Sequence, residues 1–170
     1  MSPEAPRQEG LDLVAEARRQ WRAHGWAGPD RGMAAAVSLM RAQQIVLGLL
    51  EQAVRPFALS YARYEVLMLL SFTRAGELPL SKIGQRLQVH PASVTGVVDK
   101  LEQQGLVVRA PHPQDRRAVL ARLTDEGRRV VAEATVALND GPFSSLPLSD
   151  SQAEELIAVL GQLRRAAGDF

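Results

Sequence analysis

The 170-residue sequence predicts a mainly α (α+β) fold with one small β-hairpin. Apolar side chains recur at the spacing of amphipathic helices through most of the chain. Two short β-rich runs, residues 106–110 and 118–124, flank a polar turn and interrupt that helical pattern. The length suits one domain with extensions, because a chain of this size buries a core without disulfides or metal.

The N-terminal part predicts helices separated by breaks. Residues 1–10 are polar, and we expect them to be disordered. Residues 11–24 predict a short amphipathic helix that the Gly and Pro residues at 25–29 end. A long helix follows from about residue 33 to 54, and another covers 61–72. The long helix is apolar on more than one side, which indicates a second buried face.

The middle of the chain carries the most informative order of elements. Residues 80–87 and 91–104 predict two short helices, and residues 88–90 form a tight turn between them. Pro91 suits the first position of its helix, because the missing N–H has no partner there. The β-hairpin at 106–124 follows directly. Two short helices, a tight turn and a hairpin make a winged helix-turn-helix.

Two further helices complete the chain. Thr124 can cap a helix that continues to about Asn139, where the Gly and Pro at 141–142 stop it. Ser149 and Gln152 form a capping-box pattern at the start of the last helix. The apolar residues of that helix lie along one face, which predicts a covering partner.

Composition excludes several classes of function. The chain has no Cys, which removes disulfides, thiol chemistry and Cys-ligated metals, and its three His are far apart. We therefore expect no metal site and no cofactor. No Gly-rich phosphate loop or nucleophile–base arrangement is present, so we expect no catalytic residues and no enzyme activity. The most apolar stretch, residues 33–50, contains Arg41, Gln43 and Gln44, and we expect neither a membrane span nor a targeting segment. A cytoplasmic protein follows as the expectation.

The net charge of +1 is unevenly distributed. Residues 80–130 hold nine basic and five acidic residues, a net of +4, which leaves −3 for the remainder. A basic module suits contact with phosphates. The alternative is an Arg-rich surface that happens to be uneven.

The order of these motifs resembles the MarR family of bacterial transcription regulators. The resemblance covers about residues 33–165 and rests on segments of the winged helix: Leu80-Ser81-x-Ile83, Pro91-x-Ser93-Val94-Thr95, Asp115-Arg116-Arg117 and Leu123-Thr124-x-x-Gly127. It implies a homodimer that binds palindromic double-stranded operator DNA, most simply as a repressor. The helices of residues 11–57 and 125–170 would interlock as the dimerisation region around a DNA-binding region at 58–124. The alternative is that those helices form an intramolecular core.

In this family the second helix of the pair is the recognition helix, here about residues 91–104, and its first turns would enter the major groove. The residues expected to face DNA are Pro91, Ala92, Ser93, Thr95, Gly96 and Lys100. No Arg, Asn or Gln lies in the first two turns, so direct base readout is sparse and DNA shape gains weight. Ser81 and Lys82 are expected to contact phosphates. The alternative treats these residues as ordinary polar positions on solvated helices.

The wing, about residues 106–124, would reach the minor groove. Arg117 suits the narrow, negative groove of A·T-rich DNA, and Asp115 would orient an arginine through a charge-assisted pair. Arg116 is expected to contact phosphate. The alternative is an exposed ion pair in a turn, which contributes little.

An effector site is also suggested by the resemblance. The N-terminal helix with Trp21 is similar to that of the urate- and aconitate-responsive branch, whose site residues match Trp21, Glu65 and Arg109 here. Val97 departs from that branch, which has an arginine in the recognition helix. A small aromatic or carboxylate effector would bind between the dimerisation region and the winged helix. The alternative is that Trp21 packs in the dimer interface and that Glu65 and Arg109 form a structural pair.

One competing function remains open. A winged helix can serve as a protein–protein interaction module without binding DNA. Weak salt dependence of binding to any duplex would favour that function, because phosphate neutralisation predicts a steep dependence. Carboxylates such as Asp99 and Glu102 are expected to form a solvated helix face.

Overall fold

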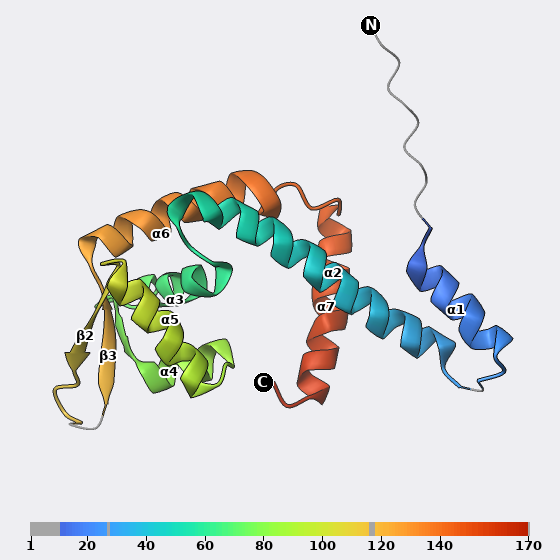
Figure 1. The fold of residues 1–170 in the computed structure, drawn as a ribbon, viewed down its shortest axis with the longest axis horizontal. Coiled ribbons are helices and arrows are strands. Elements are labelled where there is room, and N and C mark those ends of the chain that lie inside the picture. The colour runs from blue at the N-terminus through green and yellow to red at the C-terminus, as the bar shows by residue number, and fades with distance from the viewer. Residues whose placement is uncertain (1–10, 27, 116–117, 170) are drawn as a thin grey trace, which may run out of the picture. The chain divides into compact units, whose positions relative to one another are not determined.

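The computed structural model describes residues 11–26, 28–115 and 118–169, and these are mainly helical with one small antiparallel sheet (Figure 1). The predicted fold class is thereby confirmed. The chain divides into two compact units, Met1–Leu49 and Leu50–Phe170. The segment 1–10, predicted to be disordered, lies outside the described residues.

In the first unit, one carboxylate links the two helices. Helix α1 (Leu13–Ala23) starts where Asp12 accepts hydrogen bonds from two backbone N–H groups. Helix α2 (Asp30–Val54) starts three residues before the predicted position. The Asp30 carboxylate accepts hydrogen bonds of 2.7 Å from the guanidinium groups of Arg18 and Arg22. These pairs tie α1 to the first turn of α2.

Helix α2 is almost entirely exposed, since only Leu50 and Val54 among its residues are buried. The segment Asp30–Phe57 is long and apolar enough, by length and composition, to cross a membrane, with a mean hydropathy of 1.5 in its most apolar window. This match rests on length and composition alone, so the expectation that the stretch does not span a membrane stays a prediction. A helix covered by another protein chain has the same composition, however.

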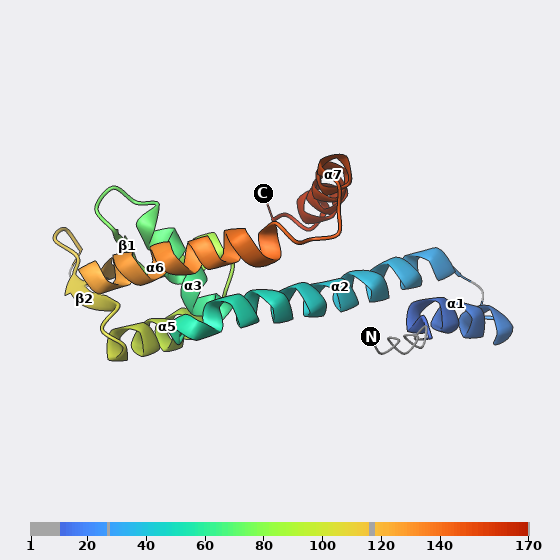
Figure 2. The same cartoon turned by 90° about the horizontal axis from the view of Figure 1, so that it is seen from above.

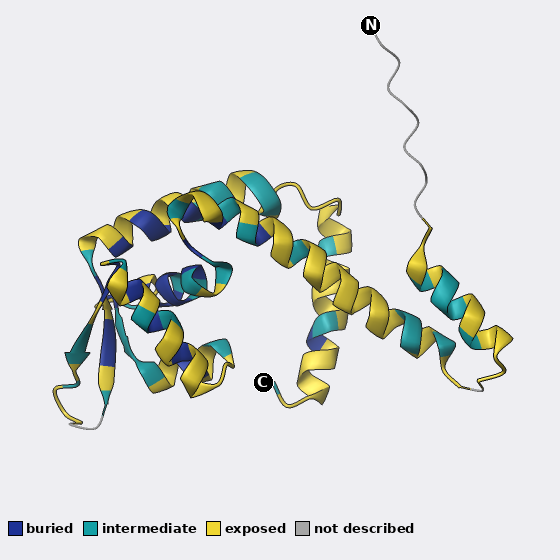
Figure 3. Ribbon diagram, viewed as in Figure 1, coloured by how far each residue is buried: buried dark blue, intermediate teal, exposed yellow. Residues whose placement is uncertain are grey.

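The second unit is built around helix α3 (Tyr61–Ser71), which follows a 3-10 turn at Arg55–Phe57. Ser60 caps the helix by accepting a hydrogen bond from the backbone N–H of Arg63. Five residues of α3 are buried: Tyr64, Val66, Leu67, Leu69 and Leu70. Figure 2 shows α3 beside both α5 and α6, and Figure 3 shows buried residues gathered where these helices meet the sheet.

The sheet has three strands in the order β1-β3-β2, all antiparallel. The predicted hairpin is confirmed as β2 (Val107–Pro111) and β3 (Val119–Leu123). The sequence did not predict β1 (Glu77–Pro79), because three residues ending in proline show no alternating pattern. Pro79 is opposite Leu120 on an edge strand, where its missing N–H is tolerated.

The remaining helices match the predicted ones closely. Helices α4 (Leu80–Leu87) and α5 (Pro91–Gln103) form the helix-turn-helix. Helix α6 (Asp125–Leu138) is capped by Thr124 and ends one residue before the predicted position. A π-helical turn at Asn139–Phe143, which the sequence did not predict, follows it and contains the Gly and Pro. Helix α7 (Asp150–Ala166) starts with the predicted capping box.

The hydrophobic core lies where α3, α4, α5, α6 and the sheet meet. Its most deeply buried large side chains are Leu67, Leu70, Ile83, Leu101 and Leu138. Helix α7 contributes only Gly161 to the buried residues, and its apolar side chains are exposed in the single chain. The core therefore fixes the winged helix firmly and leaves apolar helix faces open.

Candidate nucleic-acid interface

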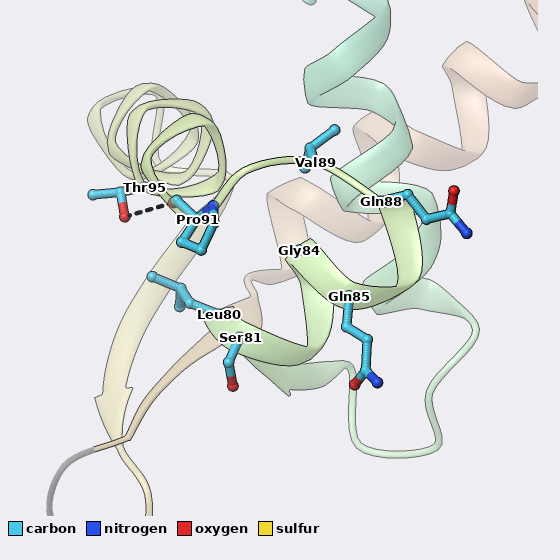
Figure 4. Close-up of a pocket in the computed structure, with 8 residues that line it drawn as sticks. All are labelled: Leu80, Ser81, Gly84, Gln85, Gln88, Val89, Pro91 and Thr95. Atoms are coloured by element: carbon cyan, nitrogen blue, oxygen red, sulfur yellow. Dashed lines mark hydrogen bonds between the residues drawn. The ribbon is translucent and has the colours of Figure 1, made fainter. Parts of the chain in front are cut away.

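The turn between α4 and α5 brings the two helices into close contact. Gln88 adopts the left-handed conformation there, with φ at 54°. A Cβ atom added at Gly84 would lie 3.2 Å from both the Val89 carbonyl oxygen and a Val94 methyl group. Beside this crossing lies an open hollow of about 450 Å³, and the side chains of Ser81 and Gln85 leave α4 on the same side (Figure 4). The crossing sets the angle at which α5 is presented.

Helix α5 presents the predicted DNA-facing residues on its exposed side. His90 caps the helix through its Nδ1, which accepts a hydrogen bond of 3.2 Å from the Ala92 backbone N–H. Sequence reasoning did not identify this cap. The apolar side, Val94, Val98 and Leu101, is buried. The exposed residues of the helix include all six predicted ones: Pro91, Ala92, Ser93, Thr95, Gly96 and Lys100.

The exposed side of α5 is low in profile. A Cβ atom added at Gly96 would meet no atom within 4 Å, so the helix surface is open at that point. The Thr95 hydroxyl donates to the Pro91 carbonyl oxygen at 3.2 Å (Figure 4). Its oxygen therefore remains available as an acceptor. Small side chains allow the backbone of α5 to approach a partner closely.

Ion pairs change the distribution of charge that the sequence indicates. Three arginines of the 80–130 segment are neutralised by carboxylates: Arg109, Arg122 and Arg129. The cations of α4 and α5 have no ion pair within the described part of the chain: Lys82, Arg86 and Lys100. Among the described residues of this segment, the cations without an ion pair are therefore these three on the helix-turn-helix and Arg128 on α6. Ser81 and Lys82 are exposed in the first turn of α4.

The wing is closed by a hydrogen bond of 3.1 Å from the His112 N–H to the Ala118 carbonyl oxygen. Asp115 is exposed in the turn. The predicted minor-groove residues Arg116 and Arg117 lie outside the described residues.

Arg109 links the wing to the recognition helix. Its guanidinium lies 2.6 Å from both the Asp99 and the Glu102 carboxylate, and its backbone N–H donates to Glu102 at 3.0 Å. Hydrogen bonds from the Arg109 backbone and guanidinium hold the pKa of Glu102 below its ordinary value. The sequence had suggested that Asp99 and Glu102 form a solvated helix face. Their pairing with Arg109 shows that this expectation was wrong. Their spacing places both on the side of α5 that meets β2.

The three residues predicted for an effector are distributed differently from the expectation. Arg109 pairs with Asp99 and Glu102, and the alternative of a Glu65–Arg109 pair is therefore wrong. Glu65 is half-buried on α3, and burial raises the pKa of its carboxyl. Trp21 belongs to the first unit, where its ring meets the edge of Trp26 at 5.0 Å. Its indole N–H is buried and has no partner among the described residues.

A cavity that sequence reasoning missed lies between α3 and α6. It measures about 650 Å³ and is lined mainly by apolar groups, with two exposed aromatic rings, Phe72 and Phe143, at its edge. Inside it the Tyr64 hydroxyl and the Thr135 hydroxyl are 3.0 Å apart. Arg128 also lines the cavity and makes no ion pair within the described ranges. No sequence pattern indicates this site, because it is formed by two helices that meet only in the folded chain.

Comparison with known proteins identifies similar molecules. The MarR family model matches residues 59–119. Sco5413, a MarR family transcriptional regulator from Streptomyces coelicolor, is 49% identical with a TM-score of 0.76, over 82% of this chain and 97% of that one. YhbI, an HTH-type transcriptional regulator from Bacillus subtilis, is 33% identical over 70% of this chain and 77% of its own. CouR from Rhodococcus jostii, solved with p-coumaroyl-CoA bound, is 29% identical with a TM-score of 0.66, over 79% and 92%.

Proposed function

The chain belongs to the MarR family of transcription regulators, and we propose that it binds a palindromic operator as a homodimer and releases it when a small effector binds. The observation that carries the DNA-binding part is the exposed side of α5, which is small in profile and flanked by unpaired cations. A repressor that blocks transcription is the simplest form of this function. Its place is the cytoplasm.

The recognition helix would contact the bases mainly through close packing in the groove and less through base-specific hydrogen bonds. Pro91 and Ala92 offer apolar contact to thymine methyl groups, and Ser93 and Thr95 offer hydroxyls. Ser81, Lys82 and Lys100 would contact phosphates and set the register of the helix in the groove. At the wing, Arg117 would enter the minor groove, oriented by Asp115, and Arg116 would contact phosphate. Specificity then depends strongly on the shape of the operator.

The exposed apolar helices support a dimer. Helix α7 exposes Ile157 by 58% and Leu163 by 56%, and helix α2 exposes Met40 by 65% in the single chain. Contact with a second copy, through regions 11–57 and 125–170, would remove these surfaces from water. A second copy also explains the apolar composition of α2 without a membrane. The two recognition helices would then face DNA about one turn apart.

Titration of labelled duplex DNA at several salt concentrations tests this function. Counterion release predicts that affinity falls steeply with salt. A protein–protein interaction module would bind weakly, with little salt dependence. That result would contradict the proposed function.

We place the effector in the α3–α6 cavity. The family resemblance suggests Trp21, Glu65 and Arg109, but the Arg109 guanidinium is already neutralised by two carboxylates. Arg128, by contrast, has no ion pair among the described residues and borders an apolar cavity with aromatic rings at its edge. An aromatic ring with a carboxylate fits that combination. CouR was solved with p-coumaroyl-CoA bound, a ligand that also carries an aromatic ring.

Two hydrogen bonds at the start of α6 support a route from this cavity to the DNA-binding helix. The Thr124 hydroxyl, at the start of α6, donates to the Gly105 carbonyl oxygen at 2.8 Å. The Thr124 backbone N–H donates to the Leu106 carbonyl oxygen at 3.1 Å. A movement of α6 would therefore be passed through these bonds to the junction of α5 and the wing. An effector that favours one position of α6 would change the affinity for DNA by differential binding.

Calorimetric titration with phenolic acids, urate and tricarboxylates tests the effector site. Arg128→Gln should weaken binding of the acids about tenfold, because a charge-assisted contact is lost. Arg129→Gln is the matched control, since the neighbouring arginine is paired with Glu126 and Glu133. No heat with any ligand, or equal loss in both variants, would contradict this placement.

A further inference from the structure

A basic hollow borders the recognition helix on the side of α3. It measures about 350 Å³ and is lined by Ser60 and Arg63 from the start of α3 and by Ser93 and Lys100 from α5. Two of its lining residues are cations, and no lining residue is acidic. The hollow therefore has a positive potential where it opens beside the exposed side of α5.

Arg63 is held in position at this hollow. Its Nε donates to the Ser60 hydroxyl at 3.2 Å, and its Nη1 donates to the Gln104 side-chain oxygen at 3.0 Å. Gln104 is itself fixed by donating its amide to the Ala58 carbonyl oxygen at 2.8 Å. Within the described ranges, Arg63 has no carboxylate partner and its Nη2 makes no hydrogen bond. The guanidinium is thus oriented by neutral groups and keeps its full charge.

Lys100 completes the cationic pair from the other helix. Its only hydrogen bond within the described part of the chain is an exposed one, to Gln103 at 3.3 Å. The Ser93 hydroxyl lies on the same hollow as a neutral donor. An oriented guanidinium, a mobile ammonium and a hydroxyl match a group with several anionic oxygens.

We propose that this hollow binds a backbone phosphate of duplex DNA, at the edge of the groove that α5 enters. The proposal rests on the proposed DNA-binding function and adds Arg63 to it. Arg63 loses little side-chain freedom on binding, because its hydrogen bonds already hold it. A phosphate contact at this point would fix α3, and with it the angle of α5 in the groove.

The test uses the full chain and a fluorescein-labelled duplex of mixed sequence, because a phosphate contact is independent of sequence. Arg63→Gln should reduce the slope of the logarithm of the binding constant against the logarithm of salt concentration by about 0.9 per protomer. Between about 50 and 200 mM salt, the loss of affinity should shrink about 3.5-fold per protomer, or about 12-fold for a dimer. Arg74→Gln is the matched control, since that exposed arginine follows the opposite end of α3.

The outcomes separate this proposal from the function it rests on. If the unchanged protein binds without salt dependence, the proposed function itself fails. If it binds steeply and Arg63→Gln behaves as Arg74→Gln does, DNA binding stands and the phosphate site is overturned. Lys100→Gln tests the same site in case the Arg63 variant misfolds. Its own fold should be unaffected, because the only hydrogen bond of Lys100 among the described residues is an exposed one. It should flatten the salt dependence by a similar amount, and an unchanged dependence would also overturn the site.

Discussion

Gly127 offers a sharp test of how the wing is attached to α6. A Cβ atom added there would lie 2.1 Å from the Leu106 carbonyl oxygen, whereas ordinary contact begins at 3.4 Å, so the two segments must separate by about 1.3 Å. Overpacking of this kind costs about 1–3 kcal/mol, and the Thr124 N–H to Leu106 hydrogen bond adds about 1 kcal/mol if it breaks. The better helix propensity of alanine offsets about 1 kcal/mol. Gly127→Ala should therefore destabilise the protein by about 1–3 kcal/mol.

The assay is urea-induced unfolding followed by circular dichroism at one fixed protein concentration, because the stability of a dimer depends on concentration. Gly96→Ala is the matched control, since its added Cβ meets no atom within 4 Å. It should stabilise α5 by about 0.5–1 kcal/mol. Equal stability of the two variants would refute the close contact between α6 and the base of the wing.

Three further predictions concern the wing, α3 and α7. Arg117→Ala should weaken DNA binding at least tenfold without unfolding the protein, and unchanged affinity at fixed salt would refute the role of the wing. Burial raises the folded-state pKa of Glu65, so its charged form destabilises the fold as pH rises above the ordinary value of 4.5. Glu65→Gln should then raise the melting temperature at neutral pH but not below about pH 4.5, and an equal shift at both would contradict this cause. Ile157→Asp should produce monomers in sedimentation, whereas the control Gln162→Asp, on the same helix, should not.

Local rules account for what could be predicted from the sequence. The caps at Thr124 and Ser149 and the hairpin at residues 106–124 depend on neighbours a few residues away, so their patterns are visible in the chain. The strand β1 was missed because its three residues become a strand only by pairing with β3.

The same distinction between local patterns and long-range packing holds for the predicted site. The exposed residues of α5 follow from helical periodicity once the helix is located. The partners of Arg109 and the link from Arg63 to Gln104, which is 41 positions away, depend on how helices pack. The α3–α6 cavity also arises from packing, and no local pattern of Phe72 or Arg128 indicates it.

Selection of bound duplexes from a random pool tests the central claim, that a homodimer reads a palindrome through two copies of α5. The selected sequences should share a palindrome whose half-sites are about one helical turn apart. Footprinting of the selected duplex should then protect both half-sites together. Recovery of single half-sites, or of no common sequence, would contradict the account.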